Sequence, residues 1–378
     1  MKKCYMCDES INDKNKSREH IILNALGGKL KSYNLLCNKC NSGLGDIIDS
    51  ELAKQFEYIT NMLNIKRDDG ETPKSVRVTG IDSGDEYILT AGGKPKHLKP
   101  AIIENIEEGK IRIKANGYEQ AEQIIRGKKR KYPEIDVEKE LRELKEIKIR
   151  KELPEMMRMK MCFGGDDAFR SLCKSAINFY MYHNGKKDNI IHLIPFIKRE
   201  SENKYISLYY PDNEILDNAD SDIFHSIVVI GNPTEKILYS YIELFSFYRV
   251  IILLTDKYEG ETFEKSYIYD LLNNEVIDKR AIINLTQVEV KNIVNNREMP
   301  FDKIKSKMIK LMVVAHERMD EDVRQQMIEN AINNSFLKYP EGVPMTQEMF
   351  KDFWNAIEED LVLWIAAHTR EEYNVTKF

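Results

Sequence analysis

Two pairs of closely spaced cysteines constrain the fold of this chain more than any other feature. Cys4 and Cys7 form one Cys-x-x-Cys pair, and Cys37 and Cys40 form the second. Four thiolates at this spacing are typical of a tetrahedral structural zinc site. A redox function of either pair is a weaker interpretation, because no thioredoxin-like strand-to-helix pattern surrounds them. The sequence therefore predicts one structural Zn²⁺ bound by these four cysteines.

The 29 residues between the two cysteine pairs predict a small insertion with its own function. Glu19 and His20 begin a short apolar run with strand character, residues 27–28 indicate a turn, and residues 34–36 are predicted as a return strand. A helix is predicted from about Asn41, because apolar residues recur at three- and four-residue steps: Leu44, Ile47, Ile48, Leu52, Phe56 and Ile59. On this helix the predicted outward-facing residues are Asp46, Asp49, Ser50 and Lys54.

This order of motifs resembles the HNH endonucleases of the ββα-metal fold, in the subgroup with two zinc knuckles. The resemblance covers about residues 1–60 and rests on the cysteine pairs, Glu-His-Ile-Ile at 19–22, Leu-Gly-Gly at 26–28 and Asn-Leu-Leu-Cys-x-x-Cys-Asn at 34–41. It implies that His20 is the first histidine of the signature, Asn34 its middle asparagine and Asn41 its third position. Glu19 takes the place of the acidic metal ligand. Asn41 departs from the histidine of many members, and asparagine suits an oxygen-preferring cation.

The chemistry of phosphodiester hydrolysis fits these residue types. Glu19 and Asn41 would offer a carboxylate and an amide oxygen to Mg²⁺ or Mn²⁺, and leave positions open for water and a substrate phosphate. A nearby cation disfavours the protonated form of His20, which makes this residue the predicted general base. Asn34 is interpreted as a brace of the loop that aims His20. Asn38 is a second, lower-ranked candidate for the amide ligand.

The charge balance predicts that any nucleic acid is bound by a local basic surface, because the net charge of the chain is −5. The densest basic cluster ends a predicted helix over residues 118–131 and consists of Arg126, Lys128, Lys129, Arg130 and Lys131. A phosphate-contacting patch and a solvated helix end are both open interpretations of this cluster. The partner is expected to be double-stranded DNA. No apolar run approaches the length of a membrane helix, so the expected location is the cytoplasm.

The remaining chain predicts an α+β protein, in which the zinc-stabilised ββα module precedes a larger mixed region with antiparallel strands and a helical C-terminus. The predicted domains are 1–62, a β-rich segment with a basic helix at 63–133, a charged connector at 134–160 and a recognition or regulatory domain at 161–378. In that last domain, residues 166–184 predict a buried helix. Its residues Lys174 and Asn178 are interpreted as polar side chains of a packed helix that belong to no functional site. Residues 190–197 predict a strand, and residues 225–254 predict a meander of three strands. In the C-terminal helical part, an apolar stripe is predicted from Trp354, Ile357, Leu361, Trp364 and Ile365. The histidines at 183, 192 and 225 are interpreted as structural.

The function predicted from these features is a metal-dependent DNA endonuclease, with a role in restriction or phage defence. Two alternatives stay open. The chain could be a zinc-dependent DNA-binding protein without catalysis, or a nuclease effector that is silent until its C-terminal region binds an activating ligand or protein. A homo-oligomer is compatible with each of these interpretations.

Overall fold

The structure is a computed structural model that describes residues 2–99, 101–105, 110–146, 156–216, 221–296, 299–336, 339–340 and 342–372. The chain divides into two compact units, one made of Met1–Ile149 and Leu153–Ala315, the other of Arg150–Glu152 and His316–Phe378. The boundaries predicted after residues 62, 133 and 160 fall within the first unit. They remain predictions about which segments fold independently.

The N-terminal module has the predicted order of strand, strand and helix. The antiparallel strands β1 (Glu19–His20) and β2 (Lys31–Ser32) flank a short 3-10 helix, η1 (Asn24–Leu26). Helices α1 (Asn38–Leu44), α2 (Ser50–Gln55) and α3 (Glu57–Met62) follow. The return strand lies at residues 31–32, so its predicted place at 34–36 was wrong. The chain leaves η1 through Gly27 at φ 89°, a conformation that favours glycine.

A π-helical turn, η2 (Gly45–Asp49), separates α1 from α2 and corrects the predicted helix face. Ile47 was expected on the buried face, but 45% of its surface is exposed. Asp49 was expected to face away from the protein, but its carboxylate contacts α6 (Asp166–Tyr182). The wider π turn rotates the residues after it relative to a regular 3.6-residue repeat, which explains both errors.

The predicted β-rich segment is a four-stranded antiparallel sheet with the order β5-β4-β3-β8. Its strands are β3 (Val76–Gly80), β4 (Glu86–Thr90), β5 (Lys94–His97) and β8 (Met157–Arg158). A separate hairpin pairs β6 (Ala101–Asn105) with β7 (Lys110–Lys114), and helices α4 (Tyr118–Lys128) and α5 (Val137–Glu146) follow it. The strands β3 to β7 and helix α4 confirm that residues 63–133 are β-rich and carry a basic helix.

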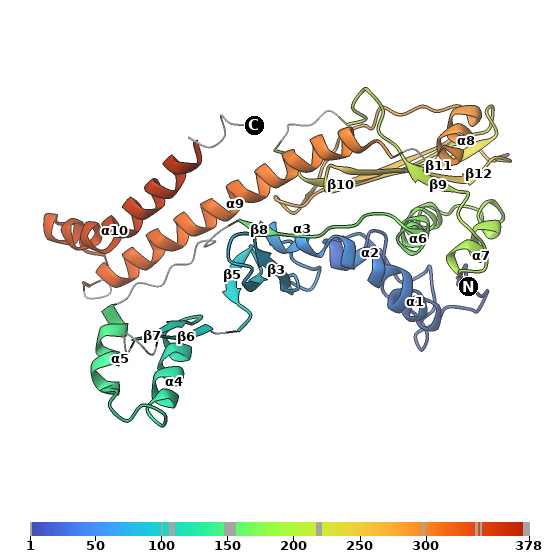
Figure 1. The fold of residues 1–378 in the computed structure, drawn as a ribbon. Coiled ribbons are helices and arrows are strands. Elements are labelled where there is room, and N and C mark those ends of the chain that lie inside the picture. Colours follow the sequence, from blue (N-terminus) through green and yellow to red (C-terminus); the bar gives the residue numbers. More distant parts are fainter. Residues whose placement is uncertain are drawn as a thin grey trace. The chain divides into compact units, whose positions relative to one another are not determined.

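A six-stranded antiparallel sheet dominates the C-terminal part of the first unit (Figure 1). Its order is β14-β13-β10-β11-β12-β9, and α6 packs against its central strands. The strands are β9 (Ile206–Leu208), β10 (Phe224–Asn232), β11 (Ile237–Leu244), β12 (Tyr248–Thr255), β13 (Phe263–Asp270) and β14 (Glu275–Val276). The predicted meander of the three strands between residues 225 and 254 is thereby confirmed.

The predicted strand at residues 190–197 was wrong. This segment forms the 3-10 helices η3 (Lys187–Asn189) and η4 (Ile191–Leu193) and the short helix α7 (Ile194–Ile197). Its buried residues are Ile190, Leu193, Ile194, Phe196 and Ile197. Their spacing includes steps of three and four residues, which suits a helix, and Pro195 fits a first helical turn because that turn needs no N–H group.

Three helices complete the described chain: α8 (Gln287–Asn295), α9 (Phe301–Phe336) and α10 (Gln347–Glu372). The two long helices confirm the predicted helical C-terminus. In the second unit, Met327, Ala331 and Ile357 form a small buried cluster with Leu361 beside it. Trp354 belongs to the same predicted apolar stripe but is 44% exposed. No helix in the described ranges combines the length and apolar character that a membrane span requires.

The N-terminal module is docked on the large sheet through a buried histidine. His225 on β10 accepts a hydrogen bond at Nδ1 from the Phe245 N–H at 3.2 Å, and its Nε2–H donates to the Leu26 carbonyl at 2.8 Å. Burial lowers the pKa of His225 to about 4, so the ring stays neutral. The predicted structural role of this histidine is confirmed.

Candidate active site

The four cysteines of the two Cys-x-x-Cys pairs meet in one cluster. Their sulfur atoms all lie within 4.8 Å of one another, and Cys7 Sγ is 3.8 Å from Cys37 Sγ. Cys37 precedes the first residue of α1, and Cys40 lies in the first turn of that helix. Burial raises the pKa of the Cys4 and Cys40 thiols, so their thiolates need a neighbouring cation. Four thiols in this arrangement can hold a metal ion such as zinc.

A pocket of about 320 Å³ is lined by residues from β1, η1, the α1–α2 segment and α6. Glu19, His20 and Asn41 all line it. The structure therefore brings together the three residues that the sequence predicted as the general base and the ligands of the catalytic metal. Arg18 and Lys74 also line the pocket and are exposed to solvent, so both can meet an anionic substrate.

The His20 side chain is 8% exposed and faces a carboxylate that the sequence analysis missed. His20 Nε2 lies 3.4 Å from Asp68 Oδ2, and Lys31 forms an ion pair with the same oxygen. The Asp68 N–H donates to Asn24 Oδ1 at 2.7 Å, which fixes the loop beside the pocket. Burial lowers the pKa of His20, and Asp68 opposes this shift. A neutral imidazole with an oriented ring is suited to accept a proton near neutral pH.

Glu19 is held by two donors from α6. Lys174 Nζ lies 2.7 Å from Glu19 Oε1, and Asn178 Nδ2 donates to the same oxygen at 2.6 Å. Asn178 in turn accepts a hydrogen bond from Tyr5 in the cysteine-bearing turn at 2.8 Å. Lys174 and Asn178 were predicted to be packing polars, and the structure corrects this, because they contact the predicted metal ligand. Their position relative to Glu19 could not be read from one helix alone.

Asp49 is the second carboxylate at this edge of the pocket. Its Oδ2 accepts from Lys174 Nζ at 2.6 Å, and its Oδ1 accepts from the Ser171 hydroxyl at 2.7 Å. Both oxygens of Asp49 are therefore engaged by α6. The π turn at Gly45–Asp49 brings this side chain to the pocket, and the sequence carries no local signal for that turn.

The three asparagines considered as site residues occupy different places. Asn41 lines the pocket, and its Nδ2 donates to Ser17 Oγ at 2.7 Å. Asn34 is exposed and lies outside the pocket lining, where its backbone N–H donates to Ser32 Oγ at 3.2 Å. Asn38 is also exposed, and its Oδ1 accepts from the Ser42 hydroxyl at 3.4 Å. Of these three, Asn41 has the placement that a metal ligand requires.

The oxygen atoms of the pocket fit a small divalent cation. The hydrogen bond from Asn178 and the short contact with Lys174 fall on Glu19 Oε1, and Asn41 uses its amide nitrogen to bond Ser17, so Glu19 Oε2 and Asn41 Oδ1 are the atoms left for a cation. One carboxylate oxygen and one amide oxygen are therefore available, and hard oxygen donors in small number suit Mg²⁺ or Mn²⁺ with several waters retained. Glu19 and Asn41 would offer these two oxygens to a divalent cation.

The basic cluster at residues 126–131 does not contribute to the pocket lining. Arg126 lies on α4 and forms ion pairs with Glu122 at 2.8 Å and with Glu138 at 3.7 Å. Lys129, Arg130 and Lys131 follow the end of α4 and are exposed. The ion pairs of Arg126 agree with a solvated helix end, while the exposed side chains stay accessible to a phosphate backbone.

Comparison with known proteins adds one result to this geometry. Residues 4–57 match the family model described as HNH endonuclease. No curated protein and no solved structure matches the chain. The matched residues include all four clustered cysteines, together with Glu19, His20 and Asn41. The N-terminal module of this chain therefore matches the HNH endonuclease family over residues 4–57.

Proposed function

We propose that this protein is a metal-dependent DNA endonuclease whose active site is the pocket of Glu19, His20 and Asn41. The observation that carries the proposal is the meeting of these residues, from β1 and α1, in one pocket within a module of the HNH family. A structural Zn²⁺ on the four cysteines would hold the module together. A role in restriction or phage defence is part of the same proposal.

In the proposed reaction, His20 removes a proton from the attacking water. Asp68 accepts the hydrogen bond from His20 Nε2–H, which leaves Nδ1 as the basic nitrogen. Glu19 and Asn41 would hold the divalent cation, which supplies charge relief to the phosphate and to the leaving oxygen. Arg18 and Lys74 would contact neighbouring phosphates. Asn34 would act at a distance from the pocket, as a brace of the loop between β1 and α1.

Replacing Asp68 with asparagine should shift the pH dependence of cleavage. Burial lowers the pKa of His20 and the Asp68 carboxylate raises it, so removing that charge should lower the pKa further. The active base is the neutral ring, so the acidic limb of the pH–rate profile should move to lower pH. The maximal rate should fall about tenfold or more, because the ring loses its orientation.

The matched control for this variant is Asp69→Asn, because Asp69 is the exposed neighbour of Asp68. It should keep the wild-type profile. Single-turnover cleavage measured across a pH series gives both quantities. An Asp68→Asn protein with the wild-type rate and acidic limb would show that Asp68 does not orient the base.

A panel of end-labelled substrates tests the proposed activity and its substrate class. Zinc-loaded protein is incubated with duplex DNA, single-stranded DNA and RNA of one sequence, with Mg²⁺ or Mn²⁺ and with a chelator. We expect cleavage of duplex DNA that requires the added metal. Metal-independent binding of duplex DNA without cleavage of any substrate would instead favour the DNA-binding protein without catalysis.

Neutralising Lys128, Lys129 and Arg130 together tests the proposed duplex-binding role of the basic cluster. Each lost phosphate contact should reduce the slope of log affinity against log salt by about 0.9, with the same loss on every DNA sequence. Fluorescence anisotropy over a salt series measures this slope. A wild-type slope in the triple variant would identify these residues as a solvated helix end.

A further inference from the structure

Lys174 places a positive charge at the nuclease pocket from outside the HNH module. Its side chain is 1% exposed, and its ammonium contacts Glu19 Oε1 at 2.7 Å and Asp49 Oδ2 at 2.6 Å. The side chain is therefore a cation between two acidic groups, one of which is the proposed metal ligand.

Charge at this site favours competition between Lys174 and a divalent cation. Two carboxylates and one ammonium leave a net charge of about −1, whereas the carboxylates alone would present about −2. Like charges repel strongly at short range in a partly buried site. Lys174 therefore weakens the attraction of the pocket for a divalent cation. When no divalent cation is bound, Lys174 balances part of the negative charge of Glu19 and Asp49.

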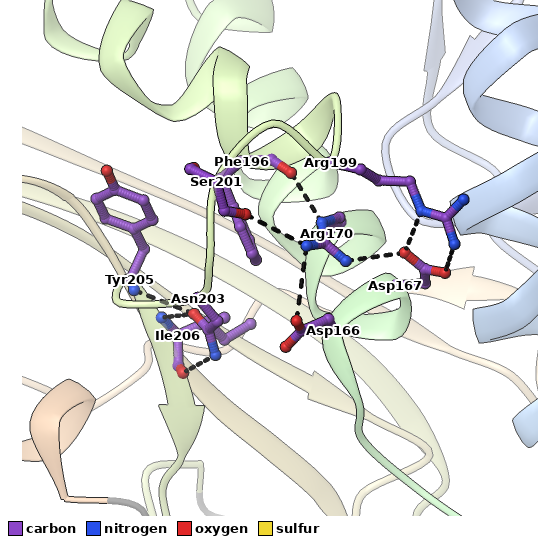
Figure 2. Close-up of polar contacts among 9 residues, drawn as sticks. All are labelled: Asp166, Asp167, Arg170, Phe196, Arg199, Ser201, Asn203, Tyr205 and Ile206. Carbon is purple, nitrogen blue, oxygen red and sulfur yellow. Dashed lines mark hydrogen bonds and ion pairs between the residues drawn. The ribbon is translucent and has the colours of Figure 1, made fainter.

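One helical turn before Lys174, Arg170 anchors α6 to the segment that leads into β9 (Figure 2). Arg170 is 7% exposed, and its Nε donates to the Phe196 carbonyl at 2.9 Å. Its other nitrogens reach the Asp167 carboxylate at 2.9 Å and the Ser201 carbonyl at 3.3 Å. Asn203, just beyond, braces the start of β9 through its hydrogen bond to the Ile206 carbonyl at 3.0 Å.

These contacts link the edge of the large sheet to the pocket through α6, in addition to the direct link from His225 to Leu26. The first turn of α6 is fixed to the segment that leads into β9, and the next turn delivers Lys174 to Glu19. A shift of α6 would therefore move the ammonium relative to the carboxylates. A ligand or partner that binds beyond residue 182 and shifts α6 would therefore change the nuclease site. It would not have to contact the pocket itself.

We propose that Lys174 is a built-in counter-cation of the nuclease pocket, which competes with the divalent cation for Glu19 and lets α6 set the metal affinity. This inference rests on the proposed function, because it assumes that Glu19 is a metal ligand. In this inference Lys174 acts on the reaction only through Glu19. The inference also gives a physical basis to the alternative in which the nuclease is silent until an activating ligand or protein binds.

The test is the affinity of full-length, zinc-loaded protein for Mn²⁺, measured by titration calorimetry. Lys174→Met removes the positive charge and should tighten Mn²⁺ binding on the order of tenfold or more. Asp49→Asn removes a negative charge and keeps a similar shape, so it should weaken binding by a similar factor. The control Lys187→Met removes a lysine paired with Asp8 outside the pocket lining, and should bind like wild type.

Opposite shifts in the two variants would support the inference. If Lys174→Met fails to fold by circular dichroism, Asp49→Asn decides alone, and a weaker affinity supports the inference. Wild-type affinity in every folded variant of a protein that cleaves DNA would overturn this inference and leave the proposed function standing. Absence of Mn²⁺ binding in wild type and variants alike would overturn both the inference and the proposed metal site.

Discussion

Replacing Cys37 with serine should unfold the N-terminal module, not merely slow its reaction. Cys37 is 1% exposed and directly precedes α1, so a zinc ion bound to its sulfur would fix the helix relative to the Cys4–Cys7 turn. Structural zinc contributes about 10–16 kcal/mol to the folding of small zinc modules, which equals or exceeds the typical stability of a domain. Elemental analysis should find one zinc per wild-type chain and none retained by the variant.

The damage should spread from the cysteine cluster to the pocket. Tyr5 lies between Cys4 and Cys7, and it holds Asn178, which holds Glu19. Limited proteolysis should therefore cut the variant within the module, while Cys162→Ser, at an exposed cysteine outside the cluster, should resist like wild type. Zinc-free wild-type protein that stays folded and cleaves DNA would contradict the structural role of the metal.

Replacing His20 with alanine should reduce the cleavage rate by about 10²–10⁴-fold, the usual contribution of a general base. The zinc content, the fold and the affinity for DNA should stay at their wild-type values, because the cysteines and the basic side chains are unchanged. Single-turnover cleavage and anisotropy on the same duplex separate the chemical step from binding.

The control for this variant is His316→Ala, because His316 is 52% exposed and paired with Asp320 in the second unit. It should cleave like wild type. A His20→Ala protein that cleaves within about tenfold of the wild-type rate would place the general base elsewhere.

Those parts of the site that depend on short-range sequence patterns could be predicted. The cysteine spacing, the Glu-His pair and Asn41 lie within one module, where local order along the chain reflects proximity in the fold. The partners of these residues could not be predicted in the same way. Asp68 lies 48 residues from His20, and Asn178 lies 159 residues from Glu19. Tertiary packing brings them together, and a single sequence carries no signal for it.

The errors in the fold have local physical causes. The π turn at Gly45–Asp49 breaks the regular helical repeat, so Asp49 and Ile47 were assigned to the wrong faces. The run at residues 190–197 is apolar and rich in isoleucine, which resembles a buried strand, although its buried positions have helical spacing. In contrast, the strands at 225–254 were correctly predicted because they are runs of β-branched and aromatic residues, and Pro233 marks the turn between the first two.

The most direct test of the account is the loss of supercoiled plasmid with time, at Mn²⁺ concentrations that calorimetry shows to be saturating. Zinc-loaded wild-type and Lys174→Met proteins are compared in one assay, with His20→Ala as the blank. We predict nicking by the first two proteins that stops when a chelator is added, and little or none in the blank. Equal rates in all three proteins, or no cleavage by wild type and Lys174→Met at a filled site, would contradict the claim that this pocket cleaves DNA.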